Sequence, residues 1–211
     1  ISMLLGTVVA LTQSDVKRLL AWSAVAHAGF LLVGVLGVQS PADVVPGELT
    51  SLEAVLFYLT AYGLTTLGAF AVVSLVRDAG GETTDLARWA GLGRTSPWVA
   101  GVFTLFLLAM AGIPLTSGFV SKFAVFEVAA AAGAWPVVAV AVLASVLALY
   151  VYVKVVVMMF FRDPVGDGPS VAVPSWLTVS AIAVAAAATV ALGVVPDPLL
   201  DLLGRTGELI R

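Results

Sequence analysis

The stretch Pro97–Gly133 reads PWVAGVFTLFLLAMAGIPLTSGFVSKFAVFEVAAAAG and is apolar almost throughout. At about 1.5 Å per residue, a straight helix of this length would be longer than a bilayer core of about 30 Å. Pro114 removes a backbone donor, and Gly112 and Gly118 loosen the turns beside it. We therefore expect two half-helices, over residues 98–112 and 117–133, with unwound backbone between them.

Lys122 lies about two turns beyond this break, inside the same apolar run. A lysine at such a depth costs about 2.5–3.5 kcal/mol on insertion scales. Unwound backbone persists in a membrane only when it is buried in protein or lines a water-filled cavity. A broken helix beside an intramembrane cation indicates ion or proton handling. The alternative is that Lys122 snorkels outward, but it lies roughly 16 Å from the helix end near Gly133.

The composition is that of a helical membrane protein. Hydrophobic residues make up 61% of the chain and charged residues 11%, with a mean hydropathy of +1.09. Soluble domains are nearer 45–50% and about 25%. We predict an all-α transmembrane bundle of about six helices, one of them discontinuous. The expected ranges are 1–12, 16–38, 51–76, the broken 98–133, 137–161 and 174–195, giving a membrane domain over 1–195 and a short amphipathic tail over 196–211, expected to be interfacial.

Several kinds of chemistry are excluded by the residues themselves. The chain has no cysteine, which excludes disulfides, thiolate metal sites and iron–sulfur clusters, and its single histidine cannot form a multi-histidine site. The sequence contains no nucleotide-binding loop, nucleophile elbow or basic patch for nucleic acid. No metal site is expected.

The start of the chain and its loop charges bear on topology. Ile1 lies inside an apolar run without a charged leader, so we expect further helices upstream. The positive-inside rule places the basic loops in the cytoplasm and the C-terminus outside. The basic residues expected on the cytoplasmic side are Lys17, Arg18, Arg77, Arg88, Arg94 and Arg162.

His27 is the second candidate residue, near the middle of the helix over 16–38, with Ser23 one turn before it. Histidine titrates near neutral pH and can relay protons through either nitrogen. A single hydrogen bond across a helix interface is an equally good interpretation. In the next helix, Tyr58, Tyr62 and Thr66 share a stripe with Thr65 beside it, and these hydroxyls could support a water path or only join helices.

The remaining candidates are weaker. Lys17 lies at the cytoplasmic mouth, where a topology signal explains it and a gate to a water path is the alternative. Thr116 and Ser117 could supply hydroxyls or water contacts at the break. Glu127 is about 140° round the helix from Lys122, so we expect an exit-side or interface group.

Two passages resemble the antiporter-like membrane subunits of respiratory complex I and of multisubunit cation/proton antiporters. Asp15–Phe30, DVKRLLAWSAVAHAGF, is similar to one helix of these subunits, and Ala109–Phe123, AMAGIPLTSGFVSKF, to their second broken helix. The lysine of the second motif looks most like the N-subunit branch of complex I. The similarity follows the order of helices over the whole chain.

The resemblance implies a fold of fourteen helices in two inverted halves, with this chain supplying roughly helices nine to fourteen. It makes Lys122 the terminal proton-transfer lysine, with His27 and Lys17 on the same path. Some relatives carry histidine or lysine where this chain has Thr65 and Thr66, so water is expected to replace a titratable group there.

The resemblance also implies a subunit that translocates protons in a bacterial plasma membrane without redox chemistry of its own. NADH, FMN, iron–sulfur clusters and quinone are then expected in other subunits of complex I, and neighbouring antiporter-like subunits and lipid are the expected partners. The alternatives are a subunit of a cation/proton antiporter, and a purely structural role for the polar residues.

Overall fold

The structure is a computed structural model that describes residues 1–37, 49–78, 80–164, 166 and 168–208. This part of the chain forms nine α-helices, three short strands and one 3₁₀ turn. The helices are α1 (Ser2–Thr12), α2 (Val16–Val35), α3 (Ser51–Val73), α4 (Leu92–Thr95), α5 (Pro97–Ala111), α6 (Ser117–Ala131), α7 (Trp135–Phe161), α8 (Trp176–Val194) and α9 (Asp197–Glu208). The strands are β1 (Val76–Asp78), β2 (Gly81–Glu82) and β3 (Ser170–Val171), and the 3₁₀ turn η1 is Leu86–Trp89.

Several helices begin where the local sequence supplies a capping side chain or a proline. Asp15 accepts a hydrogen bond from the Arg18 amide (2.8 Å) at the start of α2, and Thr50 and Glu53 form a capping box at the start of α3. Proline occupies the first turn of α5 and of α7, where its missing N–H is not needed. Local chemistry therefore defines these helix starts before any tertiary contact is considered.

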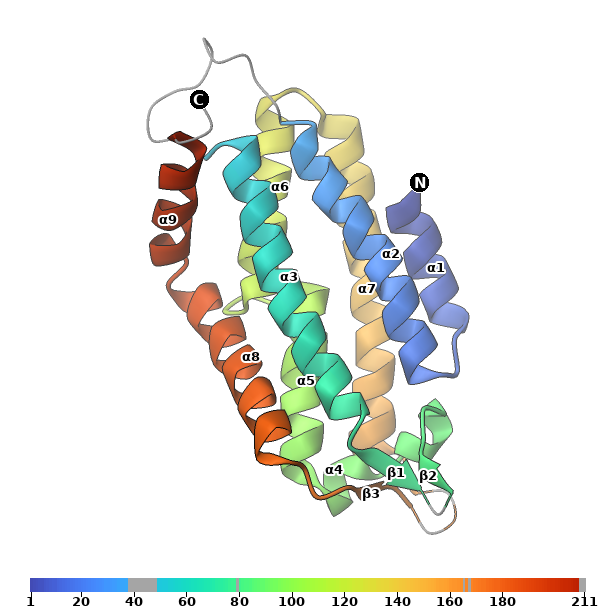
Figure 1. Ribbon diagram of the computed structural model, residues 1–211. Coiled ribbons are helices and arrows are strands. Elements are labelled where there is room, and N and C mark those ends of the chain that lie inside the picture. The colour runs from blue at the N-terminus through green and yellow to red at the C-terminus, as the bar shows by residue number, and fades with distance from the viewer. Residues whose placement is uncertain (38–48, 79, 165, 167, 209–211) are drawn as a thin grey trace.

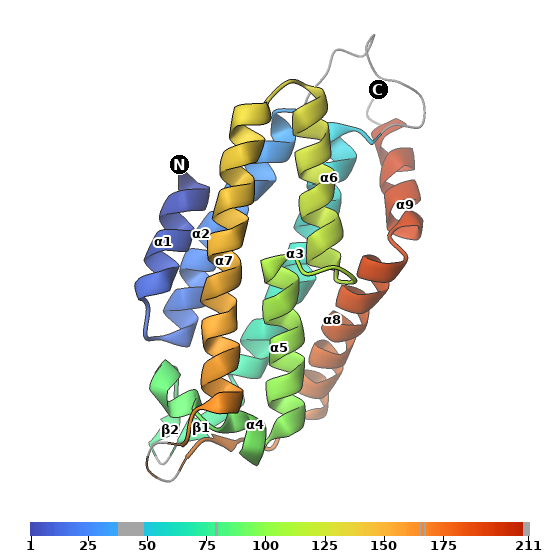
Figure 2. The same ribbon diagram turned by 180° about the vertical axis from the view of Figure 1, so that it is seen from behind.

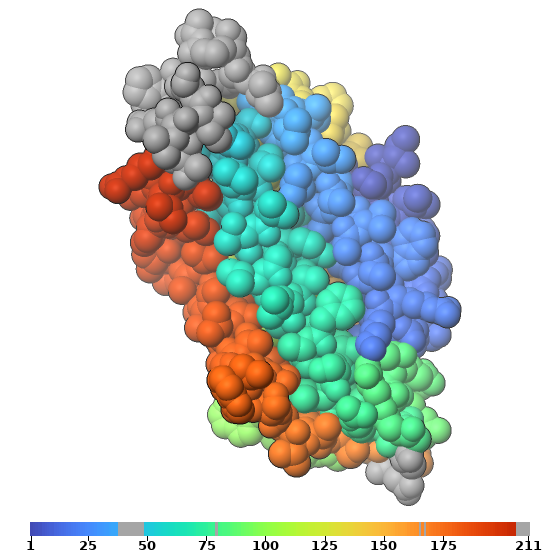
Figure 3. Space-filling model, viewed as in Figure 1, coloured from blue at the N-terminus to red at the C-terminus, as the bar shows by residue number. Residues whose placement is uncertain are grey.

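The helices form one elongated bundle (Figures 1 and 2). α3 lies between α2 on one side and α8 on the other. These three helices form the face of the molecule seen in Figure 3, with α2 in blue, α3 in cyan and α8 in orange. On the far side α5 and α6 follow one another along the bundle, next to α7. Within the described residues, α2, α3, α7 and α8 are long and apolar enough to cross a membrane. The chain is thus an all-α, multi-pass membrane bundle, with one small sheet at its end.

Two hydrophobic clusters fill the bundle. One contains Trp89, Phe103 and Tyr152, and the other contains Phe30 and Tyr58. Each cluster buries aromatic rings from several helices. Packing between helices, and not helix propensity, therefore contributes most of the stability of these helices. His27 makes hydrogen bonds to the tyrosine of each cluster, as described below.

Residues 77–96 and 163–173, which lie between the predicted helices, include short paired strands. β1 pairs antiparallel with β2 (Arg77 opposite Glu82) and with β3 (Val76 opposite Val171). The strands are only two or three residues long and distant in sequence, so no local alternation announces them. Their pairing joins the end of α3 to the segment between α7 and α8.

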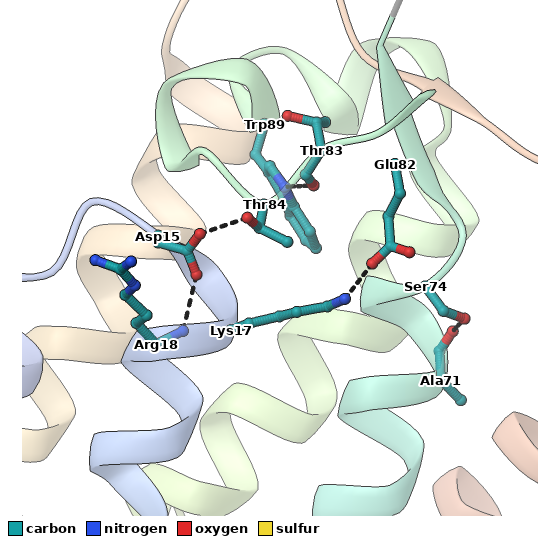
Figure 4. A network of polar contacts seen from close by, with 9 residues as sticks. All are labelled: Asp15, Lys17, Arg18, Ala71, Ser74, Glu82, Thr83, Thr84 and Trp89. Atoms are coloured by element: carbon teal, nitrogen blue, oxygen red, sulfur yellow. Dashed lines mark hydrogen bonds and ion pairs between the residues drawn. The ribbon is translucent and has the colours of Figure 1, made fainter. Parts of the chain in front are cut away.

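Charged residues lie at this same end of the bundle, and Figure 4 shows those around Lys17 and Arg18. Lys17 forms an ion pair with Glu82, and Arg94 forms one with Asp163 (2.8 Å). Partial burial raises the pKa of Asp15, but hydrogen bonds from the Thr84 hydroxyl and the Arg18 amide, together with the Arg18 charge, hold it below its usual value. Acidic side chains therefore pair with Lys17 and Arg94 at this end of the bundle.

The opposite end carries the turn between α6 and α7 and the amphipathic helix α9 (Figure 1). α9 lies beside the start of α3, where Gly204 approaches Glu53. Asp43 and Glu48, between α2 and α3, and Arg211 at the end of the chain lie outside the described residues.

Candidate functional site

The helix break lies between α5 and α6. α5 ends at Ala111, Gly112 adopts a left-handed conformation (φ 86°), and α6 begins at Ser117. Leu115 also has a positive φ of 69°, which is strained for a residue with a side chain. Pro114 lies between these two residues and cannot donate a backbone hydrogen bond. The last carbonyls of α5 are consequently available to other groups.

Lys122 binds two of these carbonyls. Its side chain is only 5% exposed, and Nζ donates hydrogen bonds to the carbonyl oxygens of Met110 (2.9 Å) and Ala111 (3.0 Å). A third hydrogen bond goes to the Ser145 hydroxyl of α7 (2.9 Å). The C-terminal end of a helix carries partial negative charge, so the end of α5 is suited to hold an ammonium group. Nζ also lies 4.9 Å from the centre of the Phe30 ring, a cation–π distance.

His27 is held on three sides. Nδ1 lies 2.7 Å from the Tyr58 hydroxyl and Nε2 lies 3.2 Å from the Tyr152 hydroxyl. The Tyr152 hydroxyl also bonds Ser23 Oγ (2.5 Å), and the Tyr62 ring stacks on the imidazole with 4.2 Å between centroids. Because a phenol can donate or accept, both ring nitrogens are satisfied in either neutral tautomer.

Two small cavities flank His27. One is lined by Ser23, His27 and Tyr152 on the side of α1 and α7, and the other by His27, Thr65 and Ser121 on the side of α3 and the break. Each has room for about one water molecule. His27 lines both, so an imidazole separates two places where water can bind. Lys122 lines neither of the two cavities.

The hydroxyls near the break differ in how they are satisfied. Thr116 donates to the Ile113 carbonyl (2.7 Å), and Thr65 donates to the Ala61 carbonyl (2.8 Å). The hydroxyl oxygens of Ser117 and Thr66 are buried without a hydrogen-bond partner among the described residues. Buried hydroxyls in this state are typical sites for an ordered water.

Two sequence candidates lie away from this cluster. Lys17 is at the charged end of the bundle, paired with Glu82 and with 46% of its side chain exposed (Figure 4). Glu127 is exposed on α6. The structure therefore brings His27, Tyr58, Tyr62 and Lys122 into one buried region. It leaves Lys17 and Glu127 at the surface.

Tyr152 and Ser145 were missed from the sequence. Both lie on α7, seven residues apart, which places them on one face of the helix. A polar pair at this spacing inside an apolar run was the available signal. Their partners are distant along the chain, so the sequence could not show that Tyr152 contacts His27 and that Ser145 contacts Lys122. Within the described residues, no group of three His, Cys, Asp or Glu side chains could hold a metal ion.

Tyr152→Phe should lower the thermal stability of the detergent-solubilised protein. The substitution removes the hydroxyl shared by Ser23 and His27 and leaves buried polar atoms unpaired, at an expected cost of about 1–3 kcal/mol. Tyr150→Phe is the matched control, because Tyr150 is on the same helix but 66% exposed. Equal melting temperatures for the two variants would contradict the shared-hydroxyl geometry.

The fold and the site define a multi-pass helical membrane protein with a discontinuous helix and a buried lysine, an arrangement common in ion-transporting proteins. The family described as NADH:quinone oxidoreductase/Mrp antiporter, transmembrane, matches residues 1–148. The chain belongs to this family.

The most similar proteins support the same placement. The chain is 58% identical to NADH-quinone oxidoreductase subunit N of Nocardioides sp., over all of this chain and 40% of that protein. A chain of respiratory complex I from Thermus thermophilus with bound aureothin has a TM-score of 0.78 and 32% identity, over 96% of this chain and 43% of that one. A chain of the Mrp complex from Dietzia sp. has a TM-score of 0.75 and 26% identity, over 96% and 44%.

The resemblance to antiporter-like subunits, and to the N subunit in particular, is confirmed by these matches. The chain spans about 40% of the length of the curated relatives that it matches.

Proposed function

We propose that this chain is part of a proton-translocating membrane subunit of a bacterial NADH:quinone oxidoreductase. It would contribute roughly helices nine to fourteen of a fourteen-helix fold with two inverted halves, with residues 1–195 as the membrane domain and 196–211 as a tail. The electron carriers NADH, FMN, iron–sulfur clusters and quinone belong to other subunits. Neighbouring antiporter-like subunits and lipid surround it.

The observation that carries this proposal is the buried ammonium of Lys122 at the end of a broken helix. A charge kept this deep is costly, so its presence favours a functional role, and the carbonyls of α5 provide a binding place for it. His27 separates two water-sized cavities at the same level of the bundle. Charge changes elsewhere in the complex would alter whether Lys122 holds or releases its proton.

The direction of transport follows from the charged end. If the cluster of basic loops faces the cytoplasm, α6 and its Lys122 lie in the outer half of the membrane and α9 at the outer surface. Protons would then enter on the side of Lys17, pass His27 and leave beyond Lys122.

A cation/proton antiporter subunit is the second candidate, because the Dietzia Mrp chain shares the fold at a TM-score of 0.75. The higher identities to subunits named N, at 52–58%, favour the first. We expect the full-length protein to co-purify with NADH-oxidising subunits and to acidify the lumen of inside-out vesicles when NADH is added. Purification with antiporter subunits alone, and sodium-driven proton movement without NADH, would reverse the assignment.

A further inference from the structure

Three oxygen atoms bind the Lys122 ammonium, and they are not chemically equivalent. The Met110 and Ala111 oxygens are backbone carbonyls, which accept hydrogen bonds and carry no proton. The third belongs to the Ser145 hydroxyl on α7, which accepts from Nζ and can also donate. Of the atoms that the structure shows bonded to Nζ, Ser145 Oγ is the one with a proton of its own.

This difference matters once Lys122 loses a proton. The ammonium has three N–H groups, and all three are used by these oxygens. A neutral amine keeps two N–H groups and gains a lone pair, which must meet a donor or stay unsatisfied in a buried place. Neither carbonyl can provide one. The Ser145 hydroxyl donates to the Ala111 carbonyl at 3.5 Å, and rotation of its O–H from that carbonyl toward Nζ satisfies the neutral amine without moving any helix.

The position of Ser145 also connects Lys122 to the rest of the site. Lys122 lines neither cavity beside His27, and its side chain is buried, whereas Ser145 is only half-buried. Ala148 and Tyr152 follow Ser145 at three and seven residues, on the same face of α7. Both of them line the cavity that His27 shares with Ser23. One face of α7 therefore runs from Lys122 to His27.

We propose that Ser145 relays the proton of Lys122, an inference that rests on the proposed function. In the transfer step, Lys122 gives one proton to Ser145 Oγ as Ser145 gives its own hydroxyl proton to a water molecule beside α7. The N–H bond breaks and an O–H bond forms on Ser145, while the original O–H bond breaks and one forms on water. The products are a neutral amine, an unchanged serine and hydronium, and no electrons move.

The test is proton flux by the whole complex, reconstituted in vesicles, with variants of Ser145. Ser145→Ala should assemble and lower the protons moved per NADH by about fivefold, the effect of one lost hydrogen bond on a transfer step. Its solvent deuterium isotope effect on flux should rise, because proton transfer from Lys122 becomes slower than the other steps. Ser145→Thr keeps the hydroxyl and should restore both values. The matched control is Ser180→Ala, since Ser180 is exposed on α8.

The outcomes separate the two proposals. If Ser145→Ala pumps with the normal ratio and isotope effect while a Lys122→Met complex does not pump, the relay is wrong and the function stands. If the Lys122→Met complex pumps normally, the proposed function itself is wrong and the relay falls with it. Should Ser145→Ala fail to assemble, Ser145→Cys keeps the volume with a much weaker hydrogen bond. Its flux should then lie below that of Ser145→Thr, and equal flux would overturn the relay.

Discussion

Lys122→Met should abolish proton translocation by an assembled complex. The variant keeps the length of the side chain but has no proton to give, and positioned acid–base groups contribute about a hundredfold or more to such steps. We therefore expect the protons moved per NADH to fall at least tenfold, to about 10% of the normal value or less. Reconstituted vesicles with a pH-sensitive dye provide the measurement.

Two companion substitutions make this result interpretable. Lys122→Arg keeps a positive charge near the α5 carbonyls, but guanidinium does not deprotonate in proteins, so this variant should assemble and still not pump. Lys154→Met is the matched control, because Lys154 is a lysine on α7 whose Nζ donates a hydrogen bond to the Leu11 carbonyl (3.2 Å) at the end of α1. Normal pumping by the Lys122→Arg complex would show that proton release from residue 122 is not required.

Gly118→Ala should prevent the two half-helices from packing. A Cβ added at Gly118 would lie 1.7 Å from the Ala109 oxygen and 2.6 Å from the Ala109 carbonyl carbon, both backbone atoms. Since neither can rotate away, α6 would have to move from the end of α5, and Lys122 would lose its carbonyls. We expect destabilisation of about 3 kcal/mol, at the upper end for overpacking, and a severe loss of assembled protein on native gels.

Gly101→Ala is the matched control for this change. Gly101 lies on α5, and a Cβ added there has no neighbour within 4 Å. A helical glycine in open space gains about 0.5–1 kcal/mol on replacement by alanine, so this variant should assemble at least as well as the parent. Similar assembly of the Gly118 and Gly101 variants would contradict the contact between α5 and α6.

The outline of the bundle followed from local sequence. Apolar runs of membrane length, prolines at helix starts and the acidic cap at Asp15 are all readable without a structure, and α2, α3, α7 and α8 lie where these signals place them. The boundaries differ mainly at the C-terminal ends, where α3 stops at Val73 instead of continuing to 76. Ser74 and Leu75 form a turn there and Val76 begins β1, because pairing with the partner strand, and not local propensity, sets this boundary.

The sequence predicted the ionisable residues of the site but not all of their partners. Lys122 and His27 stand out because an ionisable side chain inside an apolar run is costly wherever it points. The partners of these groups could not be found in the same way. Tyr58 was on the predicted stripe, but Tyr152 and Ser145 look like ordinary polar residues of an apolar helix. Their separations of 125 residues from His27 and 23 residues from Lys122 leave no periodic signal.

The sequence by itself determined that the chain is helical, enters a membrane, breaks one helix near Pro114 and keeps a histidine and a lysine at depth. These properties are local, because transfer free energy, backbone geometry and the missing proline N–H act residue by residue. Only the tertiary structure decided that α5 offers its last carbonyls to Lys122, and that α7 brings Ser145 beside Lys122 and Tyr152 beside His27. Hydrogen bonds depend on position and direction in space, and packing of distant helices alone sets these.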